Sequence, residues 1–102
     1  MTKKQFLLFK LMEECAEVTH RASKQLQFGK DEIQKDQKES NAHRLKAETL
    51  DLRVMIYLLE EESEIPTCTM EEFHAAVNRK KVKLQTYLNL STSLGQLSEI
   101  KL

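Results

Sequence analysis

The sequence predicts an all-helical protein. Its 102 residues include two glycines, one proline and no tryptophan, whereas leucine, glutamate, lysine and glutamine, which are good helix formers, are abundant. Apolar residues recur at the three- and four-residue spacing of a helix face. A chain of this length forms one small domain that buries little surface alone, so we expect a helical bundle of long antiparallel helices, completed by homo-oligomerisation.

Local signals place three helices. The expected helices cover about residues 2–28, 40–62 and 70–90. Thr2 and Gln5 form a possible capping box at the first start, and Thr69 and Glu72 form another at the third. Gly29 is suited to end the first helix, because glycine adopts the backbone conformations that follow a helix without strain.

Each expected helix carries an apolar stripe, which we expect to face the core. In the first helix the stripe is Leu8, Leu11, Met12, Cys15, Ala22 and Leu26. In the second it is Leu45, Leu52, Met55, Ile56 and Leu59, with Leu58 beside it. In the third it is Phe73, Val77, Leu84, Tyr87 and Leu88.

The segment 30–40 is polar, with Ile33 its only large apolar residue. It is expected to be a mobile surface loop or a short solvated helix, or else a loop that orders over a bound nucleotide. Residues 91–95 are expected to form a loop. We assign residues 1–90 to one domain and residues 91–102 to a tail or short docking helix.

Charge and cysteine content exclude several classes of protein. Lysine plus arginine equals aspartate plus glutamate, at 16 each, so no net charge draws the chain to a membrane or to a nucleic-acid polymer. Cys15 and Cys68 fit no zinc-binding spacing and no disulfide framework, which favours reduced thiols in the cytoplasm. No leader peptide and no apolar run long enough to span a bilayer is evident.

Two clusters of carboxylates lie inside the helical patterns. Glu14 and Glu17 are three residues apart, and so are Glu48 and Asp51, so each pair shares a helix face. If the two helices pack together, four acids converge, and they require protonation or a cation. An all-carboxylate set favours Mg²⁺ or Mn²⁺, and behind the ion a phosphorylated substrate.

Two other interpretations of the acids remain open at this point. The clusters can be a solvated face whose members pair with neighbouring bases, such as Glu17 with Arg21 four residues later. The chain would then be a non-catalytic helical interaction protein. A carboxylate-bridged di-iron bundle is disfavoured, because it needs a Glu-x-x-His motif that neither cluster has.

The acids, as Glu13-Glu14-x-x-Glu17 and Glu48-x-x-Asp51, resemble the EExxE…ExxD signature of the all-α nucleoside triphosphate pyrophosphohydrolases, the MazG-like group. The resemblance covers about residues 5–90, and the short single-domain form is similar to versions carried by bacteriophages. Its further matches are Ala22-Ser23-Lys24, Phe28-Gly29, Asn41, Lys80, Lys83 and Tyr87-Leu88. The chain departs from the family at Leu50, where glycine is common, and the lysines at 80, 81 and 83 permit more than one alignment.

The resemblance implies a helical homodimer or homotetramer that hydrolyses a (d)NTP between its α and β phosphates, with Mg²⁺ in each site and Mn²⁺ able to substitute. Carried over by position, Glu14, Glu17, Glu48 and Asp51 are the metal ligands. Glu17 is also assigned to catalysis, and Glu13 either holds a further metal or orients the attacking water. A phage form would act in the host cytoplasm.

The remaining candidates each have two interpretations. Lys24, Lys80 and Lys83 contact substrate phosphates or are ordinary surface lysines. Phe28 and Tyr87 stack on a base or pack in a core. Asn41 is also a candidate substrate ligand, by hydrogen bonding to base or sugar, or it is a helix N-cap.

Overall fold

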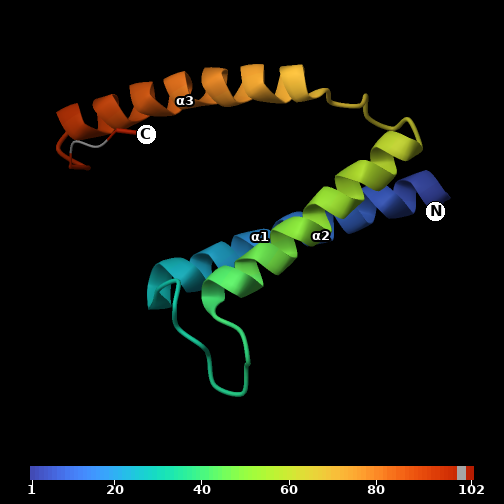
Figure 1. Cartoon of the computed structure of the whole chain (residues 1–102), viewed down its shortest axis with the longest axis horizontal. Coiled ribbons are helices and arrows are strands. Elements are labelled where there is room, and N and C mark those ends of the chain that lie inside the picture. The colour runs from blue at the N-terminus through green and yellow to red at the C-terminus, as the bar shows by residue number, and fades with distance from the viewer. Residues whose placement is uncertain (99–100) are drawn as a thin grey trace. The chain divides into compact units, whose positions relative to one another are not determined.

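A computed structural model describes residues 1–98 and 101–102, and every regular element in this part of the chain is a helix. These are α1 (Lys3–Phe28), α2 (Asn41–Glu61) and α3 (Met70–Ser93), shown in Figure 1. The all-helical class is therefore confirmed. The chain divides into two compact units, Met1–Pro66 and Thr67–Leu102, which are described separately. A single bundle, the 1–90 domain and homo-oligomerisation stay predictions.

The helix starts follow the sequence signals. Both predicted capping boxes are present, at Thr2 with Gln5 and at Thr69 with Glu72. Gly29 follows α1 with φ 92°, a region that favours glycine. The expected loop at residues 91–95 is wrong for its first three members, because α3 continues to Ser93. Nothing in residues 91–93 breaks a helix, and Thr92 bonds back to the Leu88 carbonyl.

In the first unit, α1 and α2 lie side by side and run in opposite directions (Figure 1). At one end Lys3 forms an ion pair with Glu62, and the Lys4 Nζ lies 3.3 Å from the Glu64 carboxylate. At the other end the Asn41 side-chain amide donates to the Gly29 carbonyl at 2.8 Å. Polar contacts at both ends thus set the register of the pair.

The face of α1 that is shielded by α2 differs from the predicted apolar stripe. The shielded positions are Leu7, Leu11, Glu14, Val18, Arg21 and Gln25, spaced by four and three residues. Most of the predicted stripe lies one position further round the helix and stays exposed, with Met12 68% and Leu26 87% exposed. The prediction failed because α1 has two tracks at helical spacing, and the more polar one packs on α2.

The predicted stripe of α2 is mostly correct. Leu59 is completely buried, and Leu45, Leu52, Met55 and Leu58 are half-buried, whereas Ile56 is 38% exposed. Leu59 is the one buried hydrophobic side chain in the described part of the chain. The helix pair therefore has a thin core, which is consistent with a need for further packing.

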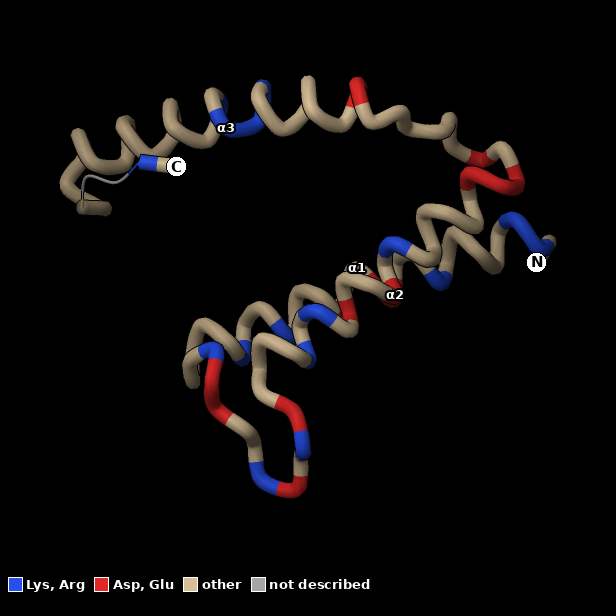
Figure 2. The backbone as a smooth tube through the Cα atoms, viewed as in Figure 1, with Lys and Arg blue, Asp and Glu red and all other residues tan. Residues whose placement is uncertain are grey.

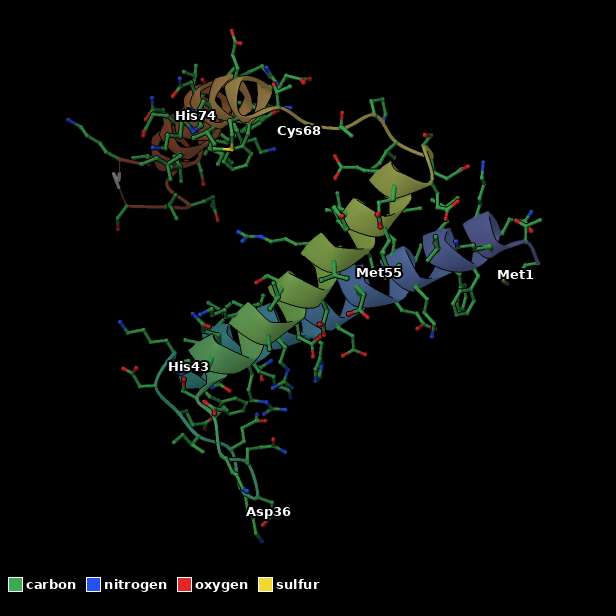
Figure 3. The ribbon with its side chains drawn as sticks, turned by 45° about the vertical axis from the view of Figure 1, so that its right-hand side comes forward. Met1, Asp36, His43, Met55, Cys68 and His74 are labelled. Atoms are coloured by element: carbon green, nitrogen blue, oxygen red, sulfur yellow. The ribbon has the colours of Figure 1, made fainter. Side chains whose placement is uncertain are left out.

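The segment between the helices is a loop that is tied to the start of α2, so the alternative of a short helix is wrong. The Asn41 and Ala42 amides donate to the carbonyls of Glu32 and Lys30, each at 3.0 Å. Figure 3 shows Asp36 at the far end of the loop, and Figure 2 shows lysines and acids alternating along it. Ordering of this loop over a bound nucleotide stays a prediction.

The second unit consists of α3 and the segment that follows it. Its predicted apolar side includes Phe73, Leu84 and Tyr87, which are 54%, 39% and 57% exposed, and no residue of α3 is buried. The Leu102 amide donates to the Gln85 side chain at 3.0 Å. The tail prediction includes residues 99 and 100, which lie outside the described residues. None of the described helices is both long and apolar enough to cross a bilayer.

Candidate metal centre

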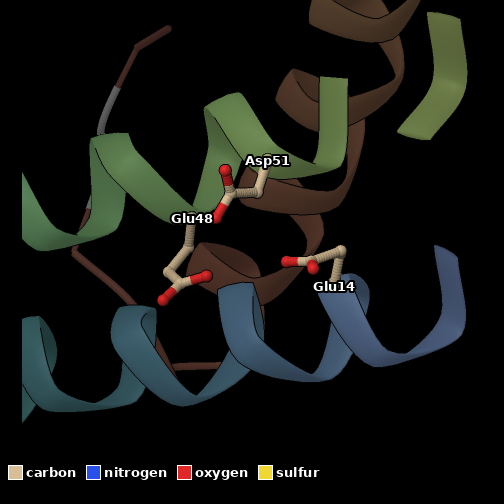
Figure 4. Close-up of side chains that lie close together, drawn as sticks. All are labelled: Glu14, Glu48 and Asp51. Carbon is tan, nitrogen blue, oxygen red and sulfur yellow. The ribbon is translucent and has the colours of Figure 1, made fainter. Parts of the chain in front are cut away.

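Three acids from the two packed helices form a compact cluster. Glu14 comes from α1, and Glu48 and Asp51 come from successive turns of α2. One carboxylate oxygen from each lies within 4.8 Å of the others, and Figure 4 shows the three side chains pointing toward one another between the helices. The sequence expectation that the two motifs converge is therefore met for these three positions.

The cluster carries electrostatic repulsion. Partial burial raises the pKa of Glu14 above its usual value, and the nearby charges of Asp51, Glu48, Glu17 and Glu13 raise it further. A raised pKa means that the ionised form of Glu14 is disfavoured at this position. A bound cation would relieve both causes, because it compensates the lost hydration and the repulsion together.

No basic side chain neutralises the cluster in the part of the chain that the structure describes. The ion pairs found there join Lys3, Lys4, Lys10 and His43 to other acids, and none includes Glu14, Glu48 or Asp51. The interpretation as a salt-bridged surface is thus not met at these three residues. The donors are carboxylate oxygens, so the residues present fit a hard cation such as Mg²⁺ or Mn²⁺.

The other two motif acids lie at the edge of this cluster. Glu17 is exposed, and it is not among the three residues whose oxygens converge, although its charge contributes to the raised pKa of Glu14. Glu13 is also exposed and accepts a hydrogen bond from Lys10 Nζ at 3.0 Å. Their assignments as a fourth ligand and as a catalytic group stay predictions.

Arg21 is a candidate that sequence reasoning missed. It was treated as a surface partner of Glu17, yet its side chain is buried, with 7% exposed. Its Nη1 has no hydrogen-bond partner, and no ion pair to Arg21 occurs among the described residues. A buried unpaired cation is costly, so an anionic ligand is a natural complement. Its position seven residues after Glu14, on the same helix face, was the available signal.

Asn41 is not the N-cap of α2. Ser40 occupies that position and accepts from the His43 amide, and Asn41 is the first helical residue. The side chain of Asn41 is 1% exposed and donates to the Gly29 carbonyl and to Glu32. Its Oδ1 has no partner. Asn41 therefore ties the loop to both helix ends, and one acceptor remains free.

The predicted phosphate and base contacts on α1 have neighbours of their own. The Lys24 Nζ lies 5.8 Å from the centre of the Phe28 ring, which is a cation–π arrangement, and Phe28 is 51% exposed. Phe28 thus does not pack in a core within this unit. Neither side chain is brought to the acid cluster by a contact that the structure records.

On α3 the predicted lysines share one side of the helix. Lys80 and Lys83 border a hollow of about 430 Å³ together with Arg79 and Ala76. Figure 2 shows this basic group along α3. Arg79 is an addition to the predicted set, while Tyr87 is exposed on the same helix. Whether any of them contacts a substrate stays a prediction.

Comparison with known proteins identified no similar protein. No protein-family model matches the chain, and searches of curated proteins and of solved structures found no match either. The interpretation of the site therefore depends on its own geometry.

Proposed function

We propose that this protein is a Mg²⁺-dependent nucleoside triphosphate pyrophosphohydrolase of the MazG-like kind, active as a homodimer or homotetramer. The reaction would convert a (d)NTP to the monophosphate and pyrophosphate. The observation that carries the proposal is the convergence of Glu14, Glu48 and Asp51 without a neutralising base. These are three of the four positions at which the EExxE…ExxD resemblance expects metal ligands.

In this proposal the carboxylates hold the ion. Glu14, Glu48 and Asp51 would hold it, and Glu17, whose side chain is exposed, would complete the set by a change of rotamer. The ion, when bound, supplies positive charge to the triphosphate oxygens and lowers the pKa of a coordinated water. Glu13 accepts a hydrogen bond from the attacking water after leaving Lys10.

The basic residues neutralise the substrate. Arg21 donates from its unpartnered Nη1 to phosphate oxygens, which satisfies its own buried charge. Lys24 contributes from the next turns of α1, and Lys80 and Lys83 contribute from α3 of a neighbouring chain. Water attacks the α phosphorus and gives up a proton to Glu13. The bond from the α phosphorus to the oxygen that bridges it to the β phosphorus breaks, and pyrophosphate leaves with the bonding electron pair. Stabilisation of this charge is the main source of rate enhancement.

Phe28, Asn41 and Tyr87 are proposed to recognise the nucleoside. Asn41 has an unpartnered Oδ1, but this atom is buried, so accepting a hydrogen bond from a base or sugar requires the neighbouring loop to move aside. Phe28 and Tyr87 are aromatic side chains with more than half of their surface exposed, so their faces are available for stacking.

A second candidate function is a non-catalytic helical interaction protein. It is favoured by the extent of exposed apolar surface, which includes Met12, Leu26, Tyr57 and Val82. The two candidates differ in their response to metal. A true site raises the melting temperature when Mg²⁺ or Mn²⁺ binds, whereas a solvated acidic face responds little.

The decisive experiment is a product assay. Purified protein is incubated with Mg²⁺, and separately with Mn²⁺, and with each common NTP and dNTP, and monophosphate is resolved from diphosphate. Monophosphate with pyrophosphate supports the proposal, and Asp51→Asn should then lower turnover by about a hundredfold or more, since even residues that only orient ligands matter up to about a hundredfold. No turnover with either ion contradicts the proposal and favours the interaction protein.

A further inference from the structure

Helix α1 has an exposed face without charge. Its members are Leu8, Met12, Cys15, Thr19, Ala22 and Leu26, spaced alternately by four and three residues. All six are exposed, and Met12 and Leu26 are 68% and 87% exposed. This is the track beside the one that packs on α2. We call these six residues the α1 seam.

The charges of α1 avoid the seam. Between Gln5 and Phe28 every lysine, arginine and glutamate lies on the other side of the helix. These residues are Lys10, Glu13, Glu14, Glu17, Arg21 and Lys24. A solvent-facing helix surface normally carries charge, so an uncharged strip about 27 Å long predicts a contact surface.

We infer that the α1 seam packs against the same seam of a second copy, with the two helices antiparallel about a two-fold axis. A strip spaced by four and three residues is the pattern of a two-helix seam. Its spacing is the same when it is followed from either end. Antiparallel pairing therefore places Leu8 opposite Leu26, Met12 opposite Ala22 and Cys15 opposite Thr19 of the other copy.

The shapes of the paired residues agree with this arrangement. The large Met12 meets the small Ala22, and the centre of the seam has the small residues Cys15 and Thr19, which permit close approach of the helices. Leu26 and Ala22 also border a hollow of about 410 Å³ beside Leu45. Apolar side chains from the end of the second helix would cover it.

Charge selects a second α1 over the other helices of the chain. The apolar side of α3 contains Lys80, which lies between Val77 and Leu84 at helical spacing, and the seam offers no acid to pair with it. The outer face of α2 is flanked by Lys46 and Arg53. An uncharged seam is complementary to another uncharged seam, and a symmetric pair is the commonest form of homo-oligomer.

This inference rests on α1 alone and not on the proposed enzymatic activity. Glu14 lies on the neighbouring, α2-facing track of α1, and Glu48 and Asp51 lie on α2, so none of the three acids belongs to the seam. A dimer without turnover would contradict the proposed activity and leave the seam intact. A monomer with turnover would support the proposed activity, but it would overturn both the seam and the proposed oligomeric state.

The first test is the oligomeric state of the full chain, measured by sedimentation or light scattering over a range of concentrations. The wild type should be a dimer or a larger even oligomer. Met12→Glu should raise the dimer dissociation constant at least about tenfold, because dimerisation would then bury an unpaired charge. His20→Glu is the matched control on the charged side and should leave the oligomer unchanged, with circular dichroism showing that both variants stay helical.

The second test determines the direction of pairing by disulfide formation in a Cys15→Ser, Cys68→Ser background. An equimolar mixture of the Leu8→Cys and Leu26→Cys variants should give an interchain disulfide on oxidation, and neither variant should crosslink alone. A mixture of Lys10→Cys and Lys24→Cys is the control on the opposite side of the helix, because these two positions are also equidistant from the two-fold axis. A monomeric wild type, or crosslinking of Leu8→Cys alone, would overturn the inference.

Discussion

Glu14 on α1 and Asp51 on α2 bring carboxylate oxygens within 4.8 Å of each other across the helix pair, and Glu48 joins them. Asp51 is also the largest charge contribution to the raised pKa of Glu14. This arrangement is unfavourable for the protein by itself, because like charges at this separation repel. A bound cation would relieve this repulsion, so the proposed function predicts that metal binding and folding of the helix pair are linked.

Removal of the charge at Glu14 should stabilise the metal-free protein. The folded-state pKa of Glu14 is above its unfolded value, so its proton binding favours the folded state. That contribution is fully present below the unfolded pKa and is lost as pH rises through the folded pKa. At pH values above the folded-state pKa, and in the presence of a chelator, we therefore expect Glu14→Gln to have a higher melting temperature than the wild type. Glu13→Gln, which removes an exposed acid on the same helix, is the control and should not raise it.

Substitution of the three converging acids should weaken metal binding more than substitution of Glu17. We expect Glu14→Gln, Glu48→Gln and Asp51→Asn each to weaken Mn²⁺ binding by at least about tenfold, because each removes one ligand. Glu17→Gln should weaken it less, since Glu17 reaches the ion only after a rotamer change. Isothermal titration calorimetry with Mn²⁺ measures the affinity of all four variants. Equal affinity of Asp51→Asn and wild type would be evidence against the ligand assignment.

Replacement of Arg21 should weaken substrate binding without lowering the stability of the protein. Arg21→Met keeps the buried apolar part of the side chain and removes an unpaired charge, so the free energy of unfolding should be unchanged or higher. The KM for the nucleotide should rise, and Arg21→Lys should restore part of the affinity. His20→Met, at the exposed neighbouring position, is the control. A rise in stability without any change in KM would assign Arg21 no role at the phosphates.

Asn41 should matter for folding as well as for recognition. Its side-chain amide bonds the Gly29 carbonyl and Glu32 from a buried position. Loss of these bonds in Asn41→Ala should cost about 1–3 kcal/mol in the free energy of unfolding, the usual range when a buried polar group loses its partner. Lys38→Ala in the exposed loop should stay within about 0.5 kcal/mol. Urea denaturation compares the two, and equal stabilities would show that Asn41 does not anchor the loop.

Local sequence signals predicted the helices well. The capping boxes at Thr2 and Thr69 and the glycine after Phe28 depend on neighbouring residues, and all three are present in the structure. The end of α3 was misplaced, because Ser and Thr at residues 91–93 suggested a loop where backbone bonding continued. Helix ends depend on small free-energy differences that composition does not resolve.

The site was predictable in part. The i,i+3 spacing of Glu48 and Asp51 placed them on one face of α2, and the match with Glu14 followed from the expectation that the helices pack. The separation of Glu17 from this group was not predictable, because Glu14 and Glu17 have the same spacing as Glu48 and Asp51. Only the rotation of α1 against α2 distinguishes a residue facing the partner helix from one at its edge.

The sequence by itself determined the helical class, the three helices and the two acid motifs, because these depend on residues within a few turns of one another. The tertiary structure decided which side of α1 packs on α2. Two tracks on α1 have the same spacing, and the one with Glu14 and Arg21 is shielded while the one with Met12 and Leu26 stays exposed. The choice depends on contacts between residues far apart in the chain, and no local pattern contains that information.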